Sequence, residues 1–238
     1  MSVKAIISAF LLILTSCATT GGQFHVNVSS LASSAANEKG TYFLLPGNDG
    51  VTFEDLQFQE YAAYVKRILD AEGFIYAPNV KNADVAVILS YGIGEPQTTQ
   101  YTYSLPVWGQ TGVSAARTSG TVSVYGNTAT YSGNTTYTPS YGVTGMTSHV
   151  GTETTYDRYA QIAGFDYQTF LKSQKVVELW KTTITSTGSS GDLRRVFPIL
   201  IGAASPYIAK NTGKAILVKL SENDKTVRIV KGEQEEKK

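Results

Sequence analysis

The sequence predicts an α+β fold: a mixed, largely antiparallel sheet with two main helices packed on it and an extended β-hairpin or ribbon as an insertion. Three observations lead to this expectation. Residues 58–69 carry an amphipathic helical pattern between strand-like segments. Residues 83–91 form a near-continuous apolar run of strand length. Between residues 97 and 155 the composition changes, and 37 of 59 residues are Thr, Tyr, Gly or Ser.

Two short segments ahead of the helical pattern have the character of strands. Phe24, Val26 and Val28 alternate with polar neighbours, as in a strand that buries one face. Residues 41–45 form a second strand-like run. The sequence Pro-Gly-Asn-Asp-Gly at 46–50 ends that run, because these residue types favour turns.

The clearest helix is expected over residues 52–73. Its apolar stripe follows the helical period and consists of Phe58, Tyr61, Ala62, Val65, Ile68 and Leu69. Thr52 is expected to cap the start, with Asp55 three residues later giving a capping-box-like beginning. Gly73 is expected to end the helix in a left-handed conformation. This is the pattern of an amphipathic helix that lies on a sheet.

Two strands are expected after the helix, at residues 74–77 and 83–91. The second is apolar almost throughout, which is typical of a central strand covered on both faces. A strand, a helix and a strand in succession suggest a βαβ unit. Because the later segments resemble hairpins, we expect a mixed sheet instead.

The tract 97–155 carries only two formally charged side chains, Arg117 and Glu153. Its two Gly-Asn pairs, at 126–127 and 133–134, have the residue types of hairpin turns. A disordered linker is the alternative, since Gly/Ser/Thr-rich tracts are often flexible. The many tyrosines and β-branched residues favour a β-ribbon, because such side chains are enriched in strands.

Regular structure is expected to resume near residue 156. Residues 160–167 and 176–184 look like long antiparallel strands. Asp192 is placed to cap a second helix, whose apolar stripe is Leu193, Val196, Phe197, Leu200 and Ile201. Pro198 and Pro206 lie in the same segment, so a kink or two shorter helices are expected.

The C-terminal residues are expected to form a hairpin from segments 215–220 and 226–230. The mixed-sign residues 231–238 are expected to be a disordered, solvated tail. Together with the preceding elements this predicts a single α+β domain over residues 24–230, with residues 97–155 as its insertion.

The N-terminal residues have the pattern of a targeting segment. Lys4 precedes a short apolar stretch at 5–14, and the run Leu14-Thr15-Ser16-Cys17 follows it. These four residues resemble the lipobox of bacterial lipoproteins, which implies a signal peptide at 1–16 and acylation of Cys17. The apolar stretch is much shorter than the roughly 20 residues that span a bilayer. The alternative is an ordinary secretory signal with an accidental cysteine. Residues 17–23 are small and polar, as in a flexible tether.

Charge and cysteine content exclude several functions. Removal of residues 1–16 takes away Lys4 and leaves 19 basic and 19 acidic residues, so no single-sign field favours nucleic acid. Cys17 is the single cysteine, so its acylation would leave neither a disulfide nor a reactive thiolate. No cofactor is expected, because the glycines at 92 and 94 lack the helix start and third glycine of a dinucleotide-binding turn.

No catalytic or metal site is predicted. His25 and His149 are the two histidines, and a zinc site needs three or four convergent ligands. The alternative to a non-enzymatic protein is a glycan-acting hydrolase, since such enzymes use two carboxylates. Its candidates are the acidic residues that flank the tyrosine-rich tract, namely Glu95, Glu153, Asp157 and Asp166.

Candidate contact residues lie in two places. The candidate aromatic residues in the tract are Tyr101, Tyr103, Trp108, Tyr125, Tyr131 and Tyr137, which suit a protein or glycan partner. Arg194 and Arg195 stand at a helix start, where positive charge is unfavourable beside the helix dipole. They indicate either a partner surface or ion pairs with Asp192 and Glu178.

Several segments resemble an uncharacterised family of bacterial envelope lipoproteins with a small α+β domain. They are Tyr61-Ala62-Ala63-Tyr64, Gly73-Phe74, Ala83-Asp84-Val85 and Ser90-Tyr91-Gly92-Ile93-Gly94, and more loosely Leu179-Trp180-Lys181-Thr182 and Gly191-Asp192-Leu193-Arg194-Arg195. The resemblance implies a lipoprotein of the cell envelope. Because Ala18 follows Cys17 and the aspartate that resembles an inner-membrane retention signal is absent, we expect the acyl chains to anchor the protein to the periplasmic face of the outer membrane. The resemblance implies no activity, so a non-enzymatic binding or assembly module is expected, with a self-assembling structural β protein as a further alternative.

Overall fold

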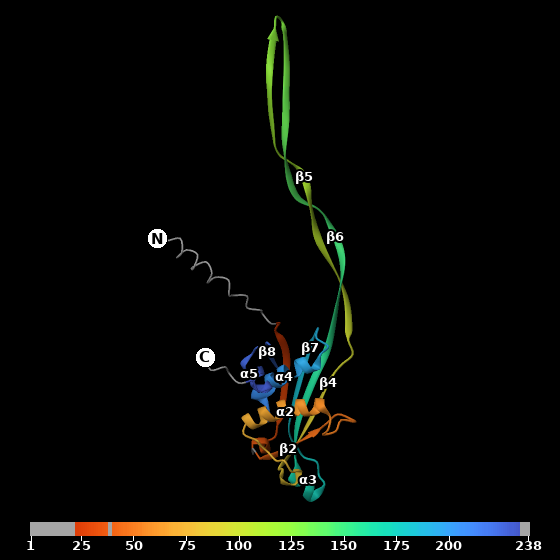
Figure 1. Ribbon diagram of the computed structural model, residues 1–238, viewed down its shortest axis with the longest axis vertical. Coiled ribbons are helices and arrows are strands. Elements are labelled where there is room, and N and C mark those ends of the chain that lie inside the picture. Colours follow the sequence, from red (N-terminus) through yellow and green to blue (C-terminus); the bar gives the residue numbers. More distant parts are fainter. Residues whose placement is uncertain (1–21, 38–39, 234–238) are drawn as a thin grey trace, which may run out of the picture. The chain divides into compact units, whose positions relative to one another are not determined.

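The computed structural model describes residues 22–37 and 40–233, and Figure 1 shows its helices and strands. The chain divides into two units, one formed by the segments up to Gln97 and from Thr155 onward, the other by Thr98–Thr154. The first unit has an α+β architecture, as predicted, and the second is a two-stranded β-hairpin.

The strands of the sheet follow the order β3-β2-β4-β6-β7-β1-β8, and β5 pairs with β6 alone. The strands are β1 (Phe24–Ala32), β2 (Thr41–Pro46), β3 (Ile75–Tyr76), β4 (Val85–Ile93), β5 (Gln97–Tyr125), β6 (Thr128–Asp166), β7 (Glu178–Gly188) and β8 (Ile216–Leu220). β2 is parallel to β3 and β4, and every other pairing is antiparallel. The sheet is therefore mixed and largely antiparallel, as the hairpin-like later segments indicated.

Four α-helices and three short 3₁₀ segments complete the described chain. The α-helices are α2 (Leu56–Ala71), α3 (Tyr167–Ser173), α4 (Leu193–Ala204) and α5 (Lys225–Lys231). The 3₁₀ segments are η1 (Ser34–Asn37), η2 (Val80–Asn82) and η3 (Ser205–Tyr207). In the described ranges, no helix has the length and apolar content that a bilayer-crossing helix requires.

Helix α2 confirms the predicted apolar stripe, since all six of its residues are buried. The helix starts later than expected: Asp55, not Thr52, is the N-cap, and its carboxylate accepts the Phe58 N–H at 2.8 Å. Gly73 follows the last turn with φ +91°, and its N–H donates to the Asp70 carbonyl. The predicted end of this helix at Gly73 was therefore right, because only glycine adopts this conformation without steric cost.

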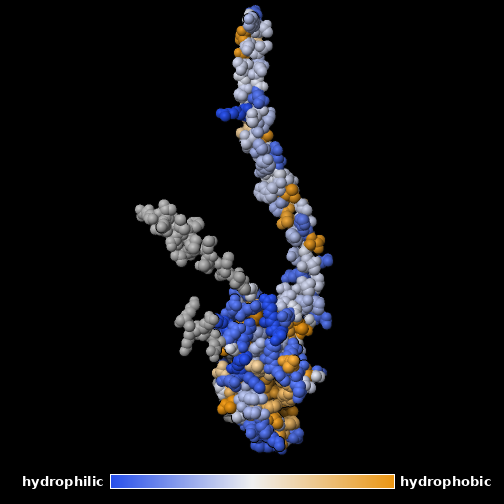
Figure 2. All heavy atoms as spheres, in the orientation of Figure 1, coloured by the Kyte–Doolittle hydropathy of each residue, from blue (hydrophilic) through white to orange (hydrophobic). Residues whose placement is uncertain are grey.

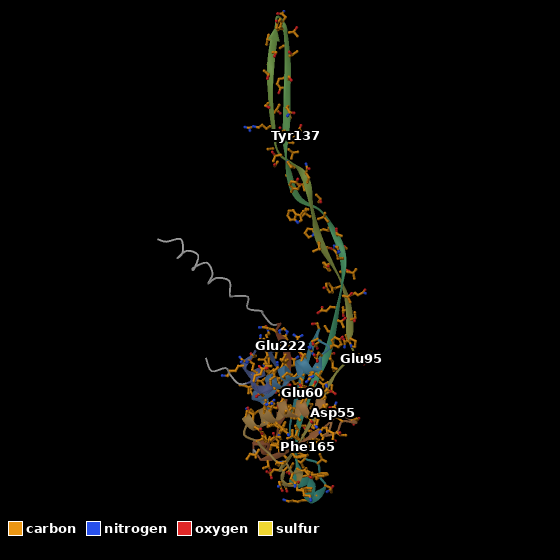
Figure 3. All side chains as sticks on the ribbon, viewed as in Figure 1. Asp55, Glu60, Glu95, Tyr137, Phe165 and Glu222 are labelled. Atoms are coloured by element: carbon orange, nitrogen blue, oxygen red, sulfur yellow. The ribbon has the colours of Figure 1, made fainter. Side chains whose placement is uncertain are left out.

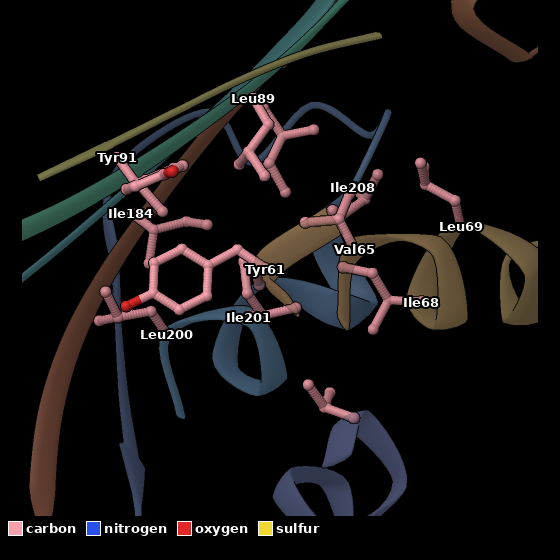
Figure 4. Packing of buried hydrophobic residues seen from close by; sticks show 14 of the residues in the cluster. Tyr61, Val65, Ile68, Leu69, Leu89, Tyr91, Ile184, Leu200, Ile201 and Ile208 are labelled. Atoms are coloured by element: carbon pink, nitrogen blue, oxygen red, sulfur yellow. The ribbon is translucent and has the colours of Figure 1, made fainter. Parts of the chain in front are cut away.

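One face of the sheet carries the hydrophobic core, to which α2, α4 and α5 contribute. The Tyr61 ring of α2 stacks on the Phe197 ring of α4, with centroids 3.8 Å apart and planes 8° from parallel. Tyr91 of β4 meets Tyr61 edge-on at 4.8 Å. Figure 4 shows the Tyr61 ring among Ile184, Leu200 and Ile201 in this core.

The other face of β4 is only partly covered, contrary to the prediction for this strand. Its residues Ala86 and Ile88 line an open apolar groove of about 260 Å³ together with Phe165, Phe170 and Val176. Helix α3 contacts β4 beside this groove, whereas the three core helices pack on the opposite face. The near-continuous apolar run therefore reflects a groove as well as a core.

Helix α4 is longer than the two prolines suggested. It runs unbroken through Pro198, and the 3₁₀ segment η3 begins only before Pro206. Every residue from Val196 to Ala204 is buried, so packing compensates the backbone hydrogen bond that Pro198 cannot make. Asp192 caps the helix as predicted, and its carboxylate accepts the Arg195 N–H at 3.2 Å.

The predicted C-terminal hairpin is wrong in its second half. Residues 216–220 form β8, but residues 225–231 form α5, which Asp224 caps by accepting the Thr226 N–H. Val227 and Val230 lie one turn apart and are fully buried. Because their spacing places both on one side of a helix, packing against α2 and α4 selects the helix.

Candidate interaction surface

The ribbon, residues 98–154, forms one hairpin closed by a two-residue turn at Gly126 and Asn127. Gly126 has φ +60°, and Asn127 is not among the residues with positive φ. A positive φ at the first turn position fits a type II′ turn, whose twist matches that of paired strands. The second Gly-Asn pair, at 133–134, lies inside β6, so the prediction of a turn there was wrong.

Side-chain contacts across the two strands hold the ribbon in register. The hydroxyl oxygens of Thr118 and Thr135 are 2.9 Å apart, and those of Thr98 and Thr154 are 3.0 Å apart. The rings of Tyr103 and His149 stack with centroids 5.6 Å apart. Each such pair contributes about 0.2–1 kcal/mol, so the pairs together favour the extended hairpin.

Tyrosine rings cover several of the glycines in the ribbon. A Cβ atom on Gly120 would lie 2.6 Å from Cζ of Tyr131, and one on Gly133 would meet the same ring. Similarly, a Cβ on Gly151 would lie 2.6 Å from Cζ of Tyr101. The glycines therefore provide the space into which these rings fold across the strand pair.

These contacts show which residues share a face in the distal ribbon, by which we mean residues 117–141 on either side of the turn. Because side chains alternate along a strand, Val122 and Val124 share a face with Gly120, and Tyr137 and Tyr141 share a face with Tyr131. The Tyr131 ring over Gly120 shows that both sets are on one face. We call this set the apolar face: Val122, Val124, Tyr131, Tyr137 and Tyr141.

The opposite side, the hydroxyl face, carries mostly small polar residues, and by the same alternation it also carries Arg117 and Tyr125. It carries Ser119, Thr121 and Ser123 from β5, and Thr130, Ser132, Asn134, Thr136 and Thr138 from β6. The Thr130 hydroxyl donates to the Ser123 carbonyl at 3.3 Å, which places the two strands' polar residues together. The two faces of the distal ribbon therefore differ in composition: the valines and most of the tyrosines lie on one face, and most of the serines and threonines lie on the other.

All six predicted aromatic contact residues are exposed. Tyr125 beside the turn is 93% exposed, and the others range from 43% to 69%: Tyr101, Tyr103, Trp108, Tyr131 and Tyr137. Figure 3 shows Tyr137 on β6, and Figure 2 shows a ribbon surface of mostly intermediate hydropathy with separate apolar patches. Tyr131 and Tyr137 belong to the apolar face. The alternation of these tyrosines with small polar residues along β6 is the sequence signal that groups them.

The two arginines at the start of α4 lie on the other unit and are paired. Arg194 Nε lies 2.8 Å from a carboxylate oxygen of Glu60, and Arg195 pairs with Glu222. The expected partners were Asp192 and Glu178, but Asp192 caps the helix and Glu178 pairs with Lys181. The hydrogen bond and charge of Glu60 raise the pKa of the Arg194 guanidinium.

Two of the carboxylates proposed for a hydrolase, Asp157 and Asp166, have separate structural roles in the first unit. Asp157 accepts the Thr187 hydroxyl at 2.5 Å, while Asp166 lies nine residues further along β6 and caps α3. Hydrogen bonds from the Thr169 N–H and hydroxyl hold the pKa of Asp166 below its usual range. A general acid needs a raised pKa, so Asp166 is poorly suited to that role.

The two remaining carboxylates of that set, Glu95 and Glu153, are both exposed. Glu95 follows the end of β4 in the first unit, and Glu153 belongs to the ribbon. Among the described residues no group of three or more His, Cys, Asp or Glu side chains is placed to hold a metal ion. His149 instead stacks on Tyr103, and His25 lies on β1.

Arg158 of β6 is a buried residue that the sequence did not single out. It is 2% exposed, and its guanidinium donates to the Ser186 carbonyl, the Ser186 hydroxyl and the Ser190 carbonyl at 3.2–3.4 Å. Burial lowers its pKa, although an arginine stays charged in a protein. Its partners are neutral oxygens, so it holds the loop before α4 by hydrogen bonds.

An open cleft of about 480 Å³ lies where β2 and β4 end and α4 begins. Its lining includes Asn48, Asp49, Tyr91, Gly92, Asp192 and Arg194. Asn48 is committed to the backbone of Tyr91, Asp192 to the helix cap and Arg194 to Glu60. The cleft therefore offers few free groups for chemistry.

Residues 1–21 lie outside the described part of the chain, so the acylation of Cys17 and the signal peptide at 1–16 stay predictions. The same holds for most of the tether and for residues 234–238 of the tail. The predicted start of the tail was wrong by one residue, because Lys231 is the last residue of α5.

Comparison with known proteins identifies no relative by sequence. No family model matches the chain, and no curated protein matches it. Among solved structures, the chain is similar to a PDZ domain protein from Parabacteroides distasonis, with 11% identity and a TM-score of 0.36. The alignment covers 92% of this chain and 43% of that one, so the likeness is distant and supports no statement about function.

Proposed function

We propose that this chain is a lipid-anchored protein of the cell envelope that acts as a non-enzymatic binding or assembly module, with the ribbon as its contact surface. The observation that carries the proposal is the exposure of the ribbon's aromatic residues on a hairpin that carries few charges. Tyrosine and tryptophan favour contact sites because each combines a large apolar area with a hydrogen-bonding atom.

The low stability expected of an isolated ribbon supports a role that requires a partner. An isolated two-stranded hairpin is marginally stable in water, and the ribbon pairs with no third strand over residues 98–154. Exposed strand edges usually carry lysines, prolines or bulges that prevent further pairing. The ribbon contains Arg117, Glu153, Pro106 and Pro139 as its only charged or proline residues, so this protection is sparse.

The location rests on the N-terminal sequence and on the resemblance to envelope lipoproteins. The lipobox-like run predicts acylation of Cys17. The next residue is Ala18, whereas an aspartate at this position would resemble a signal for retention in the inner membrane. The periplasmic face of the outer membrane is therefore the proposed site. Several acyl chains would give a stable anchor, whereas a single chain binds only marginally.

The test is a protease footprint of the ribbon in native membranes. Intact membranes that contain the wild-type protein are compared with the purified, dilute protein in detergent. We expect cuts between residues 97 and 155 in the dilute protein and protection of the same sites in the membranes. Equal cutting in both samples would contradict a contact role for the ribbon.

The anchor has its own test and control. A Cys17→Ala variant should lose labelling by a radioactive fatty acid and should accumulate as an unprocessed or mislocalised precursor. A Ser16→Ala variant keeps the thiol and a small residue before it, so it should be labelled and retained. Normal membrane retention of Cys17→Ala would refute the proposed anchor.

A further inference from the structure

The two outer edges of the ribbon are unpaired within the described chain. β5 pairs with β6 alone, and β6 pairs with β4 and β7 only from Tyr156 onward. Over residues 98–154, one edge of each strand therefore presents backbone N–H and C=O groups with no strand beside it. Such an edge is a template for another strand.

The length of these edges limits what can cover them. β5 spans 29 residues, whereas a typical strand has about 5–6 residues. At about 3.3 Å per residue the edge runs for roughly 90 Å, so an ordinary strand would leave most of it bare. A second copy of this chain offers a strand of the matching length in every molecule.

Charge and side-chain pattern are also compatible with like copies. Arg117 and Glu153 are the only formal charges on the ribbon, so two ribbons placed side by side bring little repulsion. If neighbouring copies have the same orientation, the apolar faces form one continuous surface and the hydroxyl faces form the other. Each surface then places the predominant side chains of one copy beside those of its neighbour.

The direction of the strands selects one arrangement. β5 and β6 are antiparallel, so β6 of one copy and β5 of the next are antiparallel when both turns point the same way. This arrangement uses both edges of every ribbon. A two-fold arrangement of β5 against β5 either points the two turns in opposite directions or places the apolar face of one copy beside the hydroxyl face of the other, and it leaves both β6 edges bare.

We infer that the ribbons of several copies of this chain pair edge to edge, with β5 of one copy along β6 of the next and all turns at the same end. The contact is head-to-tail, so it continues from copy to copy and ends when the row closes into a ring. This inference rests on the proposed function in one respect: a common membrane anchor holds all copies in the same orientation. The partner of the ribbon is then the protein itself.

Disulfide formation between different copies tests the arrangement. Acylation of Cys17 leaves the mature protein without a free thiol, so each variant carries one introduced cysteine. Ser119→Cys places it on β5, and four separate variants place it on β6 along the same hydroxyl face: Ser132→Cys, Asn134→Cys, Thr136→Cys and Thr138→Cys. Four positions are needed because the stagger between copies is unknown.

Full-length Ser119→Cys protein is co-expressed with each β6 variant, and membranes are oxidised before extraction. We expect a mixed disulfide between Ser119→Cys and one or two adjacent β6 positions, with at least tenfold less at the others. Asp49→Cys, in the other unit, serves as the control for random collision. Native mass spectrometry of the detergent-extracted wild-type protein should show several copies per particle.

Three results would overturn the inference. Cross-links between two Ser119→Cys copies alone would show the two-fold arrangement. Equal cross-linking of the Asp49→Cys control would show collision, and a monomeric particle with no mixed disulfide would show that the edges stay free of other copies. In each case, the proposed function would still hold, with a different partner, if Cys17 retains the protein in the membrane and the ribbon is protected from protease. If membrane retention and ribbon protection are both absent, the proposed function is refuted independently of this inference.

Discussion

The indole ring of Trp180 on β7 lies over Gly164, the residue paired with it on β6. A Cβ atom on Gly164 would lie within 2.8 Å of the ring atom Cζ2. Trp180 is 2% exposed and has the largest of the fully buried side chains among the described residues. The core therefore depends on the absence of a side chain at one position of a central strand.

A Gly164→Ala variant should be destabilised by about 1–3 kcal/mol, because the added methyl group overpacks a rigid ring in a well-packed core. The measurement is the free energy of unfolding in urea, followed by tryptophan fluorescence. Gly94→Ala is the matched control, since its Cβ would make only ordinary contacts with Asp157 at 3.5 Å or more. Equal stability of the two variants would contradict the packing account.

The ribbon permits a comparison of two glycines that both have open space for a side chain but differ in backbone conformation, Gly126 in the turn and Gly145 in β6. A Cβ would have open space at both Gly126 and Gly145, but only Gly126 has a positive φ. Gly126→Ala should therefore cost about 1 kcal/mol in the ribbon, while Gly145→Ala should cost less or stabilise it. Hydrogen exchange of the ribbon amides measures this, and a larger loss of protection in Gly145→Ala would contradict the expectation.

Arg158 should be hard to replace even by lysine. Its three nitrogens each donate to a separate oxygen of the β7 end and the following loop. An ammonium group is more compact and cannot reproduce this planar arrangement. Arg158→Lys should lose about 2 kcal/mol of unfolding free energy, since hydrogen bonds from charged donors are stronger than neutral ones.

The control for this substitution is Arg117→Lys on the ribbon, where the side chain is exposed and the effect should stay within about 0.5 kcal/mol. Both unfolding free energies come from urea denaturation at pH 7. Arg158→Lys stability equal to that of Arg117→Lys would show that the hydrogen bonds of Arg158 contribute little.

Local patterns in the sequence predicted much of the fold. The six apolar positions of α2, the left-handed Gly73 and the Asp192 cap are each set by residues within one or two helical turns. The ribbon was also predictable in kind, because Tyr, Thr and Val favour strands and a Gly-Asn pair favours a turn. Such features depend little on distant parts of the chain.

The errors arose where distant residues decide the structure. Residues 226–230 have the β-branched composition of a strand, but they form α5 because Val227 and Val230 pack against α2 and α4. Pro198 is tolerated inside α4 because the surrounding residues are buried. The partners of Arg194 and Arg195 come from α2 and from the turn after β8, and no local pattern indicates which carboxylates the fold brings near.

The cap of α3 should give the protein a measurable dependence on acid. The Asp166 carboxylate accepts hydrogen bonds from the Thr169 N–H at 2.8 Å and the Thr169 hydroxyl at 2.7 Å, and these bonds lower its pKa in the folded state. A lowered folded pKa means that the unfolded chain binds the proton more readily. The stabilisation is therefore complete above the unfolded pKa of about 3.9 and is lost as the pH falls through the folded pKa.

Two variants separate this titration from the loss of the cap itself. Asp166→Asn keeps a capping oxygen but does not titrate, so its unfolding free energy should fall less than that of the wild type between pH 5 and about pH 2–3. Asp166→Ala removes the cap and should lose about 1 kcal/mol at pH 7. Thr169→Val removes the hydroxyl donor, so its pH dependence should lie between those of the wild type and Asp166→Asn. If Asp166→Asn and the wild type lose stability in parallel as the pH falls, this carboxylate does not carry the acid sensitivity.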